Sequence, residues 1–337
     1  MYFLILDIYS QIWYNLTCMN LVFFDIECAS VNRTTAKICA FGYVVCDENF
    51  NIIKKEDILI NPRGGFHLTD RKGNKGLVLP YQYSEFKKYP PFKEAYPFIK
   101  SLLEDKNTVV LGHSILNDVK YLNLETRRFH LPSFDFQFLD SQLMFMSYSG
   151  DFTHQSGLEH IAVNLGVEFT PHRAVDDAYA TMRVVEAICK AEGCTFNELV
   201  KLYGLSRGRI KNHNIYSPTS AGVKEYHKRV DEEKKERSQK RIEFFNYISR
   251  KKCKRNGAFY GKVFTFSRAI EDDVECAKEL CDEIYCNGGR YSHHLKDCNF
   301  YICDNGDDTQ RTANARDMDI TVIDINGLKE MLNEPTS

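Results

Sequence analysis

The sequence predicts a mixed α/β protein in which two domains are joined by a basic connector. Apolar runs of strand length at residues 21–60 are followed by alternating helix and strand patterns up to residue 192. The composition then becomes strongly basic, and a second, shorter α/β pattern begins after residue 257. Because 337 residues exceed the roughly 100 to 200 of one domain, we expect domains at 19–195 and 258–335 with a linker at 196–257.

The first domain begins with three strands in series and continues with helices that alternate with strands. Turn-forming residues at 47–49 separate the second strand from the third, and a Gly- and Pro-bearing stretch at 61–91 predicts an irregular segment. The expected strands are 21–27, 38–47, 50–60 and 108–113, and the expected helices are 92–105, 115–129, 157–166 and 174–192. This order predicts a mixed sheet with helices packed on it.

The connector is expected to be largely helical and basic. Residues 224–255 hold thirteen Lys or Arg and six Asp or Glu, a local net charge of +7 in a chain that totals −2. Such a run is typical of a solvated helix held by pairs four residues apart. The cluster SRKKCKR at 249–255 alternatively favours contact with phosphate groups.

The second domain repeats a shorter alternation of strands and helices. We expect strands at 260–267, 298–304 and 320–325, helices at 272–284, 311–316 and 327–332, and a glycine turn in NGGRY at 287–291. The pattern predicts a small α/β domain of roughly eighty residues.

Composition limits the class of protein but does not select its partners. A content of 43% hydrophobic and 27% charged residues excludes disorder throughout, and a net charge of −2 can hide a local basic patch. Twelve cysteines without a CxxC pair, and no secretion signal, indicate reduced thiols in the cytoplasm rather than disulfides.

The first twenty residues are apolar at the start but carry Asp7 and lack the basic and apolar regions of a signal peptide. They are also too short and polar to span a bilayer, so we expect no membrane association. Met19 stands directly before the first expected strand, which favours a native translation start there; an ordered extra strand or helix at residues 1–18 is the equal alternative.

Acidic residues on separate elements form the strongest chemical signal. Asp25 and Glu27 are two residues apart on one strand, so their side chains share a face and repel unless a cation or a proton lies between them. Asp118 lies one turn into a helix, and His172 and Asp177 lie at the start of another. Carboxylate oxygens suit Mg²⁺ or Mn²⁺ better than zinc, and two such ions can activate a water in phosphoryl displacement. A histidine, with an ordinary pKa of about 6.5, can take the water's proton.

The three motifs DIE, GHSILND and HRAVDD resemble those of the DEDDh exonucleases, the superfamily of the proofreading epsilon subunit of bacterial DNA polymerase III. The resemblance covers about residues 20–192 and implies an RNase H-like fold and a 3′-to-5′ exonuclease that uses two Mg²⁺ or Mn²⁺ ions. It implies that Asp25, Glu27 and Asp177 ligate the catalytic metal, that Asp25 bridges to the second ion, and that Asp118 acts through water or completes the site. His172 would be the general base. The HxAxxD spacing selects Asp177 rather than Asp176.

Several positions depart from the common pattern of that superfamily. Cys28 and Ala29 stand where Thr or Ser is frequent, so we expect them to contact the terminal nucleotide through their backbone. We place His113 in the substrate site as well, although a lone histidine is more typical of a structural role. With Ser114 and Asn117, the second motif resembles that of RNA-trimming members of the superfamily as much as that of proofreading members.

Residues 260–333 resemble a BRCT domain, on the segments GKVFTFS, NGGRY, NFYICDN and ARDMDITVIDINGLKEML. In some such domains a hydroxyl, a backbone amide at the glycine turn and a basic side chain bind a phosphate, and the matching positions are Ser267, Gly288 and Arg311. Amides and cations are suited to anions. Protein docking or packing without phosphate is the alternative.

Together these features predict a metal-dependent 3′-to-5′ exonuclease that releases nucleoside 5′-monophosphates from single-stranded or frayed ends. The resemblance of the second domain to a module frequent in DNA-repair proteins favours DNA, a role in replication or repair, and a polymerase or repair protein as partner. One alternative is an exoribonuclease that trims RNA 3′ ends. Another is a scaffold that binds nucleic-acid ends and recruits partners through its second domain.

Overall fold

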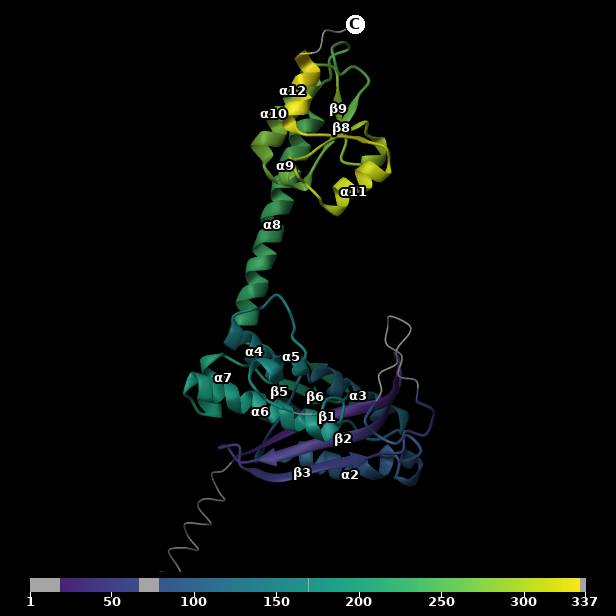
Figure 1. The fold of residues 1–337 in the computed structure, drawn as a ribbon, viewed down its shortest axis with the longest axis vertical. Helices are drawn as coiled ribbons and strands as arrows, with labels where there is room; N and C mark the ends of the chain where they lie inside the picture. The colour runs from purple at the N-terminus through teal and green to yellow at the C-terminus, as the bar shows by residue number, and fades with distance from the viewer. Residues whose placement is uncertain (1–18, 67–78, 169, 334–337) are drawn as a thin grey trace, which may run out of the picture. The chain divides into compact units, whose positions relative to one another are not determined.

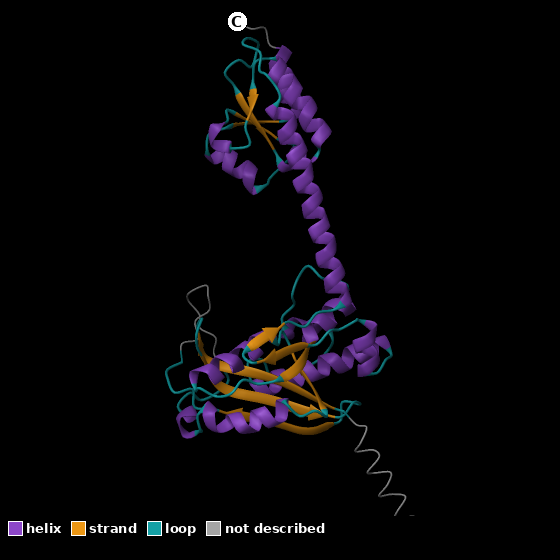
Figure 2. Cartoon of the chain, turned by 180° about the vertical axis from the view of Figure 1, so that it is seen from behind, coloured by secondary structure: helices purple, strands orange, loops and turns teal. Residues whose placement is uncertain are grey.

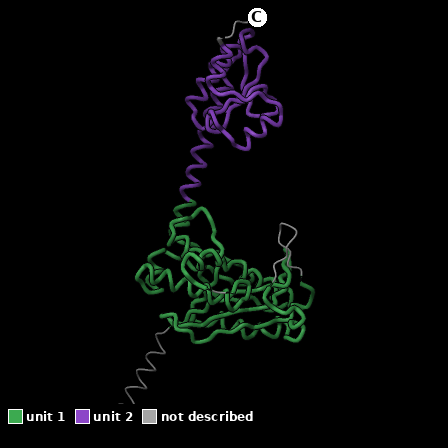
Figure 3. Tube along the Cα trace, viewed as in Figure 1, with its two compact units in different colours: residues 1–227 green, residues 228–337 purple. Residues whose placement is uncertain are grey.

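A computed structural model describes residues 19–66, 79–168 and 170–333 of the chain, which divides into compact units at 1–227 and 228–337 (Figure 3). Our expectation for residues 1–18 lies outside the described residues. Among the described residues, no helix is both long enough and apolar enough to cross a membrane.

The first unit is built on one seven-stranded mixed sheet with the order β3-β2-β1-β4-β5-β6-β7 (Figure 1). The strands are β1 Asn20–Val31, β2 Ala36–Cys46, β3 Ile52–Leu59, β4 Thr108–Gly112, β5 Phe136–Asp140, β6 Gly208–Lys211 and β7 Asn214–Tyr216. β1, β4 and β5 run parallel, whereas the other neighbouring strands are antiparallel. The predicted mixed α/β architecture is confirmed.

Helices cover both faces of this sheet, as Figure 2 shows. They are η1 Glu85–Lys88, α2 Phe92–Leu103, α3 Leu116–Arg128, α4 Ser141–Ser149, α5 Leu158–Asn164, α6 Ala174–Glu192 and α7 Phe196–Leu202. Val22 and Phe24 of β1 pack in one core with α2 and α3, while Leu21 and Phe23 pack in a second core with α4 to α7. The two-residue period of β1 thus divides its side chains between the two layers.

Asp25 and Glu27 continue the row of Leu21 and Phe23, so both acids face the layer that contains α6. β1 does not end at residue 27 as expected. β2 stays paired with it as far as Val31, opposite Ala36, with an irregular register between Glu27 and Ser30. The acids therefore lie in the middle of a paired strand, where the pairing restricts their positions.

Gly42 of β2 lets α6 approach the sheet closely. It lies opposite Asp25 on one side and opposite Asp57 on the other. A Cβ atom at this position would lie 2.0 Å from both the carbonyl carbon of Ala174 and the backbone nitrogen of Val175. The backbone of the first turn of α6 therefore rests directly on β2, between the two acids.

Residues 196–216, which we expected in the linker, form part of the first unit. α7 begins at a capping box in which Thr195 and Glu198 satisfy each other's backbone N–H groups. β6 pairs with β5 through Ile210 opposite Phe136, and Ile210 is buried in the first core. β5 and α4 were also not expected, because short buried runs resemble loops in sequence until a neighbouring strand pairs with them.

The second unit contains a four-stranded parallel sheet with the order β11-β10-β8-β9. Its elements are β8 Val263–Phe266, α9 Arg268–Asp272, α10 Val274–Cys286, β9 Arg290–Tyr291, η2 Leu295–Asp297, β10 Phe300–Ile302, α11 Gln310–Asp317, β11 Thr321–Ile323 and α12 Ile325–Asn333. Phe264 and Phe266 pack with α10 and α12, whereas Tyr301 packs with Ala315 of α11 on the other face.

The basic stretch forms the helix α8, Ala221–Ser249, within the region predicted to be helical. Phe244 is its one buried side chain among the described residues. Lys240 and Glu236 form an ion pair 2.9 Å long at a spacing of four residues. These features fit a solvated charged helix.

We predict that Gly42→Ala destabilises the first unit by about 3 kcal/mol or more, because the new methyl group would meet backbone atoms that cannot move aside. Chemical denaturation measures the unfolding free energy. Gly157→Ala is the control, since a Cβ there has no described atom within 4 Å and should change stability by less than about 1 kcal/mol. Equal stability of the two variants would contradict the close approach of α6.

Candidate metal centre

Three carboxylates meet where α6 lies against β1. Asp25 and Glu27 come from the strand, Asp177 comes from the first turn of α6, and their nearest oxygens all lie within 4.8 Å of one another. Oδ2 of Asp177 is buried and has no hydrogen-bond partner among the described atoms. An unpartnered carboxylate oxygen facing two further acids is an arrangement that a cation would stabilise.

The pKa values of the three acids are raised, which means that ionising all three at once is unfavourable. Burial, followed by the charge of Asp57, raises the pKa of Asp25 to about 7. Burial, followed by the charges of Asp25 and Asp177, raises the pKa of Glu27 to about 9. For Asp177, burial and the charge of Asp25 raise the pKa to about 8. A divalent cation among them would compensate this repulsion and favour the ionised forms.

The donor set fits Mg²⁺ or Mn²⁺. All three groups offer hard carboxylate oxygens, and no described Cys or His joins the cluster. The orphaned oxygen of Asp177 and the raised pKa values are what such a site is expected to show without an ion.

Asp118 approaches from the other layer of the fold and contacts the backbone of β1. The register between β1 and β4 covers Asn20 to Phe23 only, so the edge of β1 is open beyond that point. There the N–H of Ile26 donates to Oδ1 of Asp118 over 3.1 Å. Burial, followed by the charge of Asp25, raises the pKa of Asp118 well above its ordinary value. Asp118 thus lies beside the cluster but outside the group of three.

The loop that leads to Asp118 is held by Asp140, which the sequence analysis did not single out. Oδ1 of Asp140 accepts hydrogen bonds from the backbone N–H groups of Ser114, at 2.8 Å, and Gln142, at 2.9 Å. Ser114 has a φ of 49°, an uncommon conformation for a residue other than glycine. An acid directly before a helix is an N-cap signal that could have identified this residue.

His172 and His113 both line the cavity of about 310 Å³ beside the three acids. The two histidines differ in exposure and in hydrogen bonding. His172 is exposed, lies just before α6 and has a φ of 65°. His113 lies within hydrogen-bond distance of Ser141 Oγ, at 3.0 Å, and of the Ser156 carbonyl, at 3.1 Å. Burial lowers the pKa of His113 to about 4. His113 therefore stays neutral and joins three segments of the fold, whereas His172 is free to meet a substrate.

The side chains of Cys28 and Ala29 do not reach the cavity. Cys28 is 6% exposed in the core with α2 and α3, and Ala29 is fully buried in a small cluster with Cys39, Leu79 and Phe86. Because successive residues of a strand point to opposite faces, the two side chains pack on opposite sides of β1. Any contact with a nucleotide is thus limited to their backbone.

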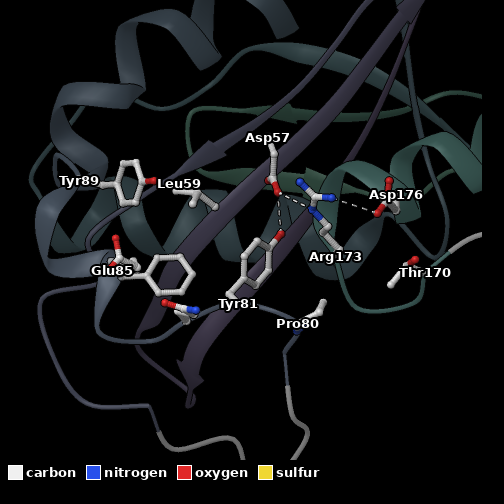
Figure 4. Close-up of a pocket in the computed structure, with 11 residues that line it drawn as sticks. Asp57, Leu59, Pro80, Tyr81, Glu85, Tyr89, Thr170, Arg173 and Asp176 are labelled. Atoms are coloured by element: carbon white, nitrogen blue, oxygen red, sulfur yellow. Dashed lines mark hydrogen bonds and ion pairs between the residues drawn. The ribbon is translucent and has the colours of Figure 1, made fainter.

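A second polar network holds the first turn of α6 from the outside (Figure 4). The Tyr81 hydroxyl donates to Oδ2 of Asp57 over 2.9 Å and accepts from the Ala174 N–H over 3.1 Å. The Arg173 guanidinium also lies 3.5 Å from that Asp57 oxygen. Sequence reasoning missed Asp57 and Tyr81, since neither belongs to a motif and only the pairing of β2 with β3 brings Asp57 opposite Gly42.

The two neighbouring acids of α6 have different surroundings. Asp177 joins Asp25 and Glu27, whereas Asp176 pairs with Lys55 at 3.1 Å and with Arg173 at 3.6 Å. Consecutive helical residues point about 100° apart, so only one of them can face the sheet. Of these two acids, Asp177 is therefore the one that lies with Asp25 and Glu27.

The three residues expected to bind phosphate in the second unit do not converge. Ser267 follows the carboxyl end of β8, and Arg311 reaches Thr265 of the same strand over 3.1 Å. Gly288 precedes β9, whose parallel pairing with β8 begins at Val263, so it lies at the amino end of the sheet. Ser267 is also buried as an N-cap, and Arg311 lies 3.6 Å from the buried Glu271. The expected set is therefore wrong, because a parallel sheet separates its two edges.

Residues 22–185, just under half of the chain, match the family model described as Exonuclease. This match lies wholly within the first unit. Comparison with curated protein sequences gives no match.

Solved structures with similar folds include two kinds of nuclease. A 3′-exonuclease that recognises the 3′ end of a histone mRNA stem-loop is 13% identical, with a TM-score of 0.46 over 60% of this chain and 92% of that one. E. coli exonuclease I with single-stranded DNA and zinc is 20% identical, with a TM-score of 0.44 over 54% of this chain and 42% of that one. This chain thus spans less than half of exonuclease I.

We predict that the metal-free protein loses stability as the pH rises from 6 to 9. The folded chain holds protons on Asp25, Glu27 and Asp177 up to pKa values of about 7, 9 and 8, whereas the unfolded chain releases them near their ordinary values of 3.8 to 4.5. The folded state therefore binds more protons in this window, and the unfolding free energy falls as they leave. Saturating Mg²⁺ or Mn²⁺ should reverse the loss, because the ion binds the ionised carboxylates.

Thermal unfolding in EDTA at pH 6 and pH 9, repeated with Mg²⁺, measures this effect. Glu27→Gln is the matched variant and should show a smaller pH dependence, since it removes one titrating acid. A melting temperature whose pH dependence is the same in that variant and in the native chain would contradict the coupling.

We also predict that Tyr81→Phe destabilises the protein by about 1.5–3 kcal/mol and weakens Mn²⁺ binding, because Asp57 and the Ala174 N–H lose the hydroxyl that joins them. Denaturation and calorimetric titration measure the two effects. Tyr89→Phe is the control, since Tyr81 and Tyr89 both line a separate cavity of about 450 Å³, and the Tyr89 hydroxyl has no hydrogen bond to a described residue. Unchanged Mn²⁺ affinity in Tyr81→Phe would rule out a positioning role.

Proposed function

We propose that this chain is a metal-dependent 3′-to-5′ exonuclease that hydrolyses phosphodiester bonds at the 3′ ends of single-stranded or frayed DNA and releases nucleoside 5′-monophosphates. The observation that carries the proposal is the group of three carboxylates, with oxygens within 4.8 Å, beside the exposed His172 in a domain matched by the exonuclease family. This arrangement combines an oxygen-donor cation site with a solvent-accessible base.

In this proposal Asp25, Glu27 and Asp177 would hold the two Mg²⁺ or Mn²⁺ ions. When bound, the ions would supply charge stabilisation for the phosphoryl group and would make a water more acidic. His172 accepts the proton of the attacking water, since it is exposed and lines the cavity together with the three acids. Asp118 fixes β1 through the Ile26 N–H and contributes to the site through water.

Our preference for DNA, and for a role in replication or repair, rests on the second unit. We propose that this unit is a BRCT-like domain that docks a polymerase or a repair protein. The parallel sheet with the order β11-β10-β8-β9, and the positive φ of 87° at Gly288 in the glycine turn, support this resemblance. For the boundaries, we propose that the exonuclease domain extends through β7 and that α8 is the connector.

We predict that the full chain shortens 5′-labelled single strands progressively and releases a labelled mononucleotide at once from 3′-labelled strands. EDTA should abolish both activities, because the carboxylates need their ions. Matched DNA and RNA strands measure the sugar preference, and faster removal of DNA is expected. Faster trimming of RNA would make the chain an exoribonuclease, and endonucleolytic fragments would refute 3′ polarity.

Two variants of adjacent acids separate catalysis from end binding. Asp177→Asn should abolish cleavage while raising the metal-free melting temperature at pH 9, because it removes one charge from a repelling group. Asp176→Asn, which breaks only the pairs with Lys55 and Arg173, should retain most of the activity. An unchanged rate in Asp177→Asn would favour the scaffold function instead.

A further inference from the structure

The second unit contains a cavity whose charged side chains are all cationic. It has a volume of about 890 Å³, and none of the twelve described residues that line it is an acid. Its cations are Lys251, Lys252, Lys254, Arg255, Lys262 and Arg290. We refer to it as the basic cavity.

The cations converge because the segment after α8 runs along the glycine turn. The Lys254 N–H donates to the Tyr285 carbonyl over 3.2 Å, and the Cys253 thiol donates to the Gly288 carbonyl over 2.9 Å. A Cβ at Gly288 would lie 2.7 Å from the Asn256 carbonyl oxygen, and φ at Gly288 is 87°. A glycine at this position thus lets the basic segment and the turn lie together.

Most of these charges have no ion-pair partner among the residues that the structure describes. Lys251 pairs with Asp282, and Lys262 lies over the rings of Phe259 and Phe300. Lys252, Lys254, Arg255 and Arg290 form no ion pair with a described residue. This differs from α8, where Lys240 pairs with Glu236. Four uncompensated like charges around one cavity repel one another and are suited to a polyanion.

The exposed ring of Tyr260 indicates which class of polyanion the basic cavity would bind. Its side chain is 65% exposed although it lines the same cavity as the cations. An exposed aromatic ring among lysines and arginines is the combination that binds single-stranded nucleic acids, because the ring stacks on a base while the cations follow the phosphates. A phosphopeptide offers one phosphomonoester, which a single compact group of donors would satisfy without six spread cations.

We propose that the basic cavity binds the phosphodiester backbone of a single-stranded nucleic acid, with Tyr260 stacked on one of its bases. This site lies wholly within the second unit, and its occupancy does not depend on the nuclease activity. In this proposal the SRKKCKR cluster contacts phosphate groups, and the preceding helix α8 is a solvent-exposed charged helix.

The test is fluorescence anisotropy of the full chain with labelled dT20 and rU20 in EDTA, over a series of salt concentrations. The variant carries Lys252→Gln, Lys254→Gln and Arg255→Gln, all exposed positions. Binding should weaken, and the slope of log affinity against log salt should fall by about 2, since each phosphate contact on a single strand contributes about 0.7. Tyr260→Ala should weaken binding by about fivefold to 100-fold, whereas Tyr260→Phe keeps the ring and the affinity.

The matched control carries Lys228→Gln, Lys235→Gln and Arg237→Gln on the exposed face of α8, which removes the same charge elsewhere in the second unit. It should change the slope by much less than the cavity variant. An equal loss in both variants would overturn the proposal in favour of non-specific attraction. An unchanged slope in the cavity variant, or a phosphoserine peptide bound there in place of either strand, would also overturn it.

Discussion

The contact between α6 and β2 at Gly42 determines the geometry of the three carboxylates that form the candidate metal centre. Because Gly42 has no side chain, the backbone at Ala174 rests on the strand, and the same first turn of the helix brings Asp177 to Asp25 and Glu27. Any larger residue would clash with this backbone and push the helix away from the strand. Three carboxylates that repel one another are thus kept together by backbone packing rather than by their own interactions.

The charge around this contact is compensated on one side only. Asp25, Gly42 and Asp57 lie opposite one another across three strands. Tyr81 and Arg173 hold the outer acid, Asp57, and tie it to the start of α6. The inner acids have no comparable cationic partner among the described residues, although Asp57 and Asp177 each keep one buried carboxylate oxygen without a hydrogen bond. The three acids that lack a cationic partner among the described residues therefore lie at the cavity that His172 also lines.

In the second unit, the direction of the strands decides which residues can act together. All four strands are parallel, so residues that follow strands meet at one edge and residues that precede them meet at the other. Ser267 and Arg311 lie at the first edge, where both have structural partners. Gly288 lies at the second edge with the basic cavity. The two edges thus have different electrostatic character although they share one small sheet.

The sequence by itself determined the mixed α/β class, the helix α6 and the acids on β1, because hydrophobic period and motif spacing are local properties. It could not determine that β6 and β7 complete the first sheet, that Asp57 and Tyr81 support α6, or that Gly288 lies apart from Ser267. Each of these depends on which strands pair and in which direction, and pairing joins residues distant in the chain. Only tertiary structure decides such contacts, since their free energy comes from burial and register that a local pattern does not encode.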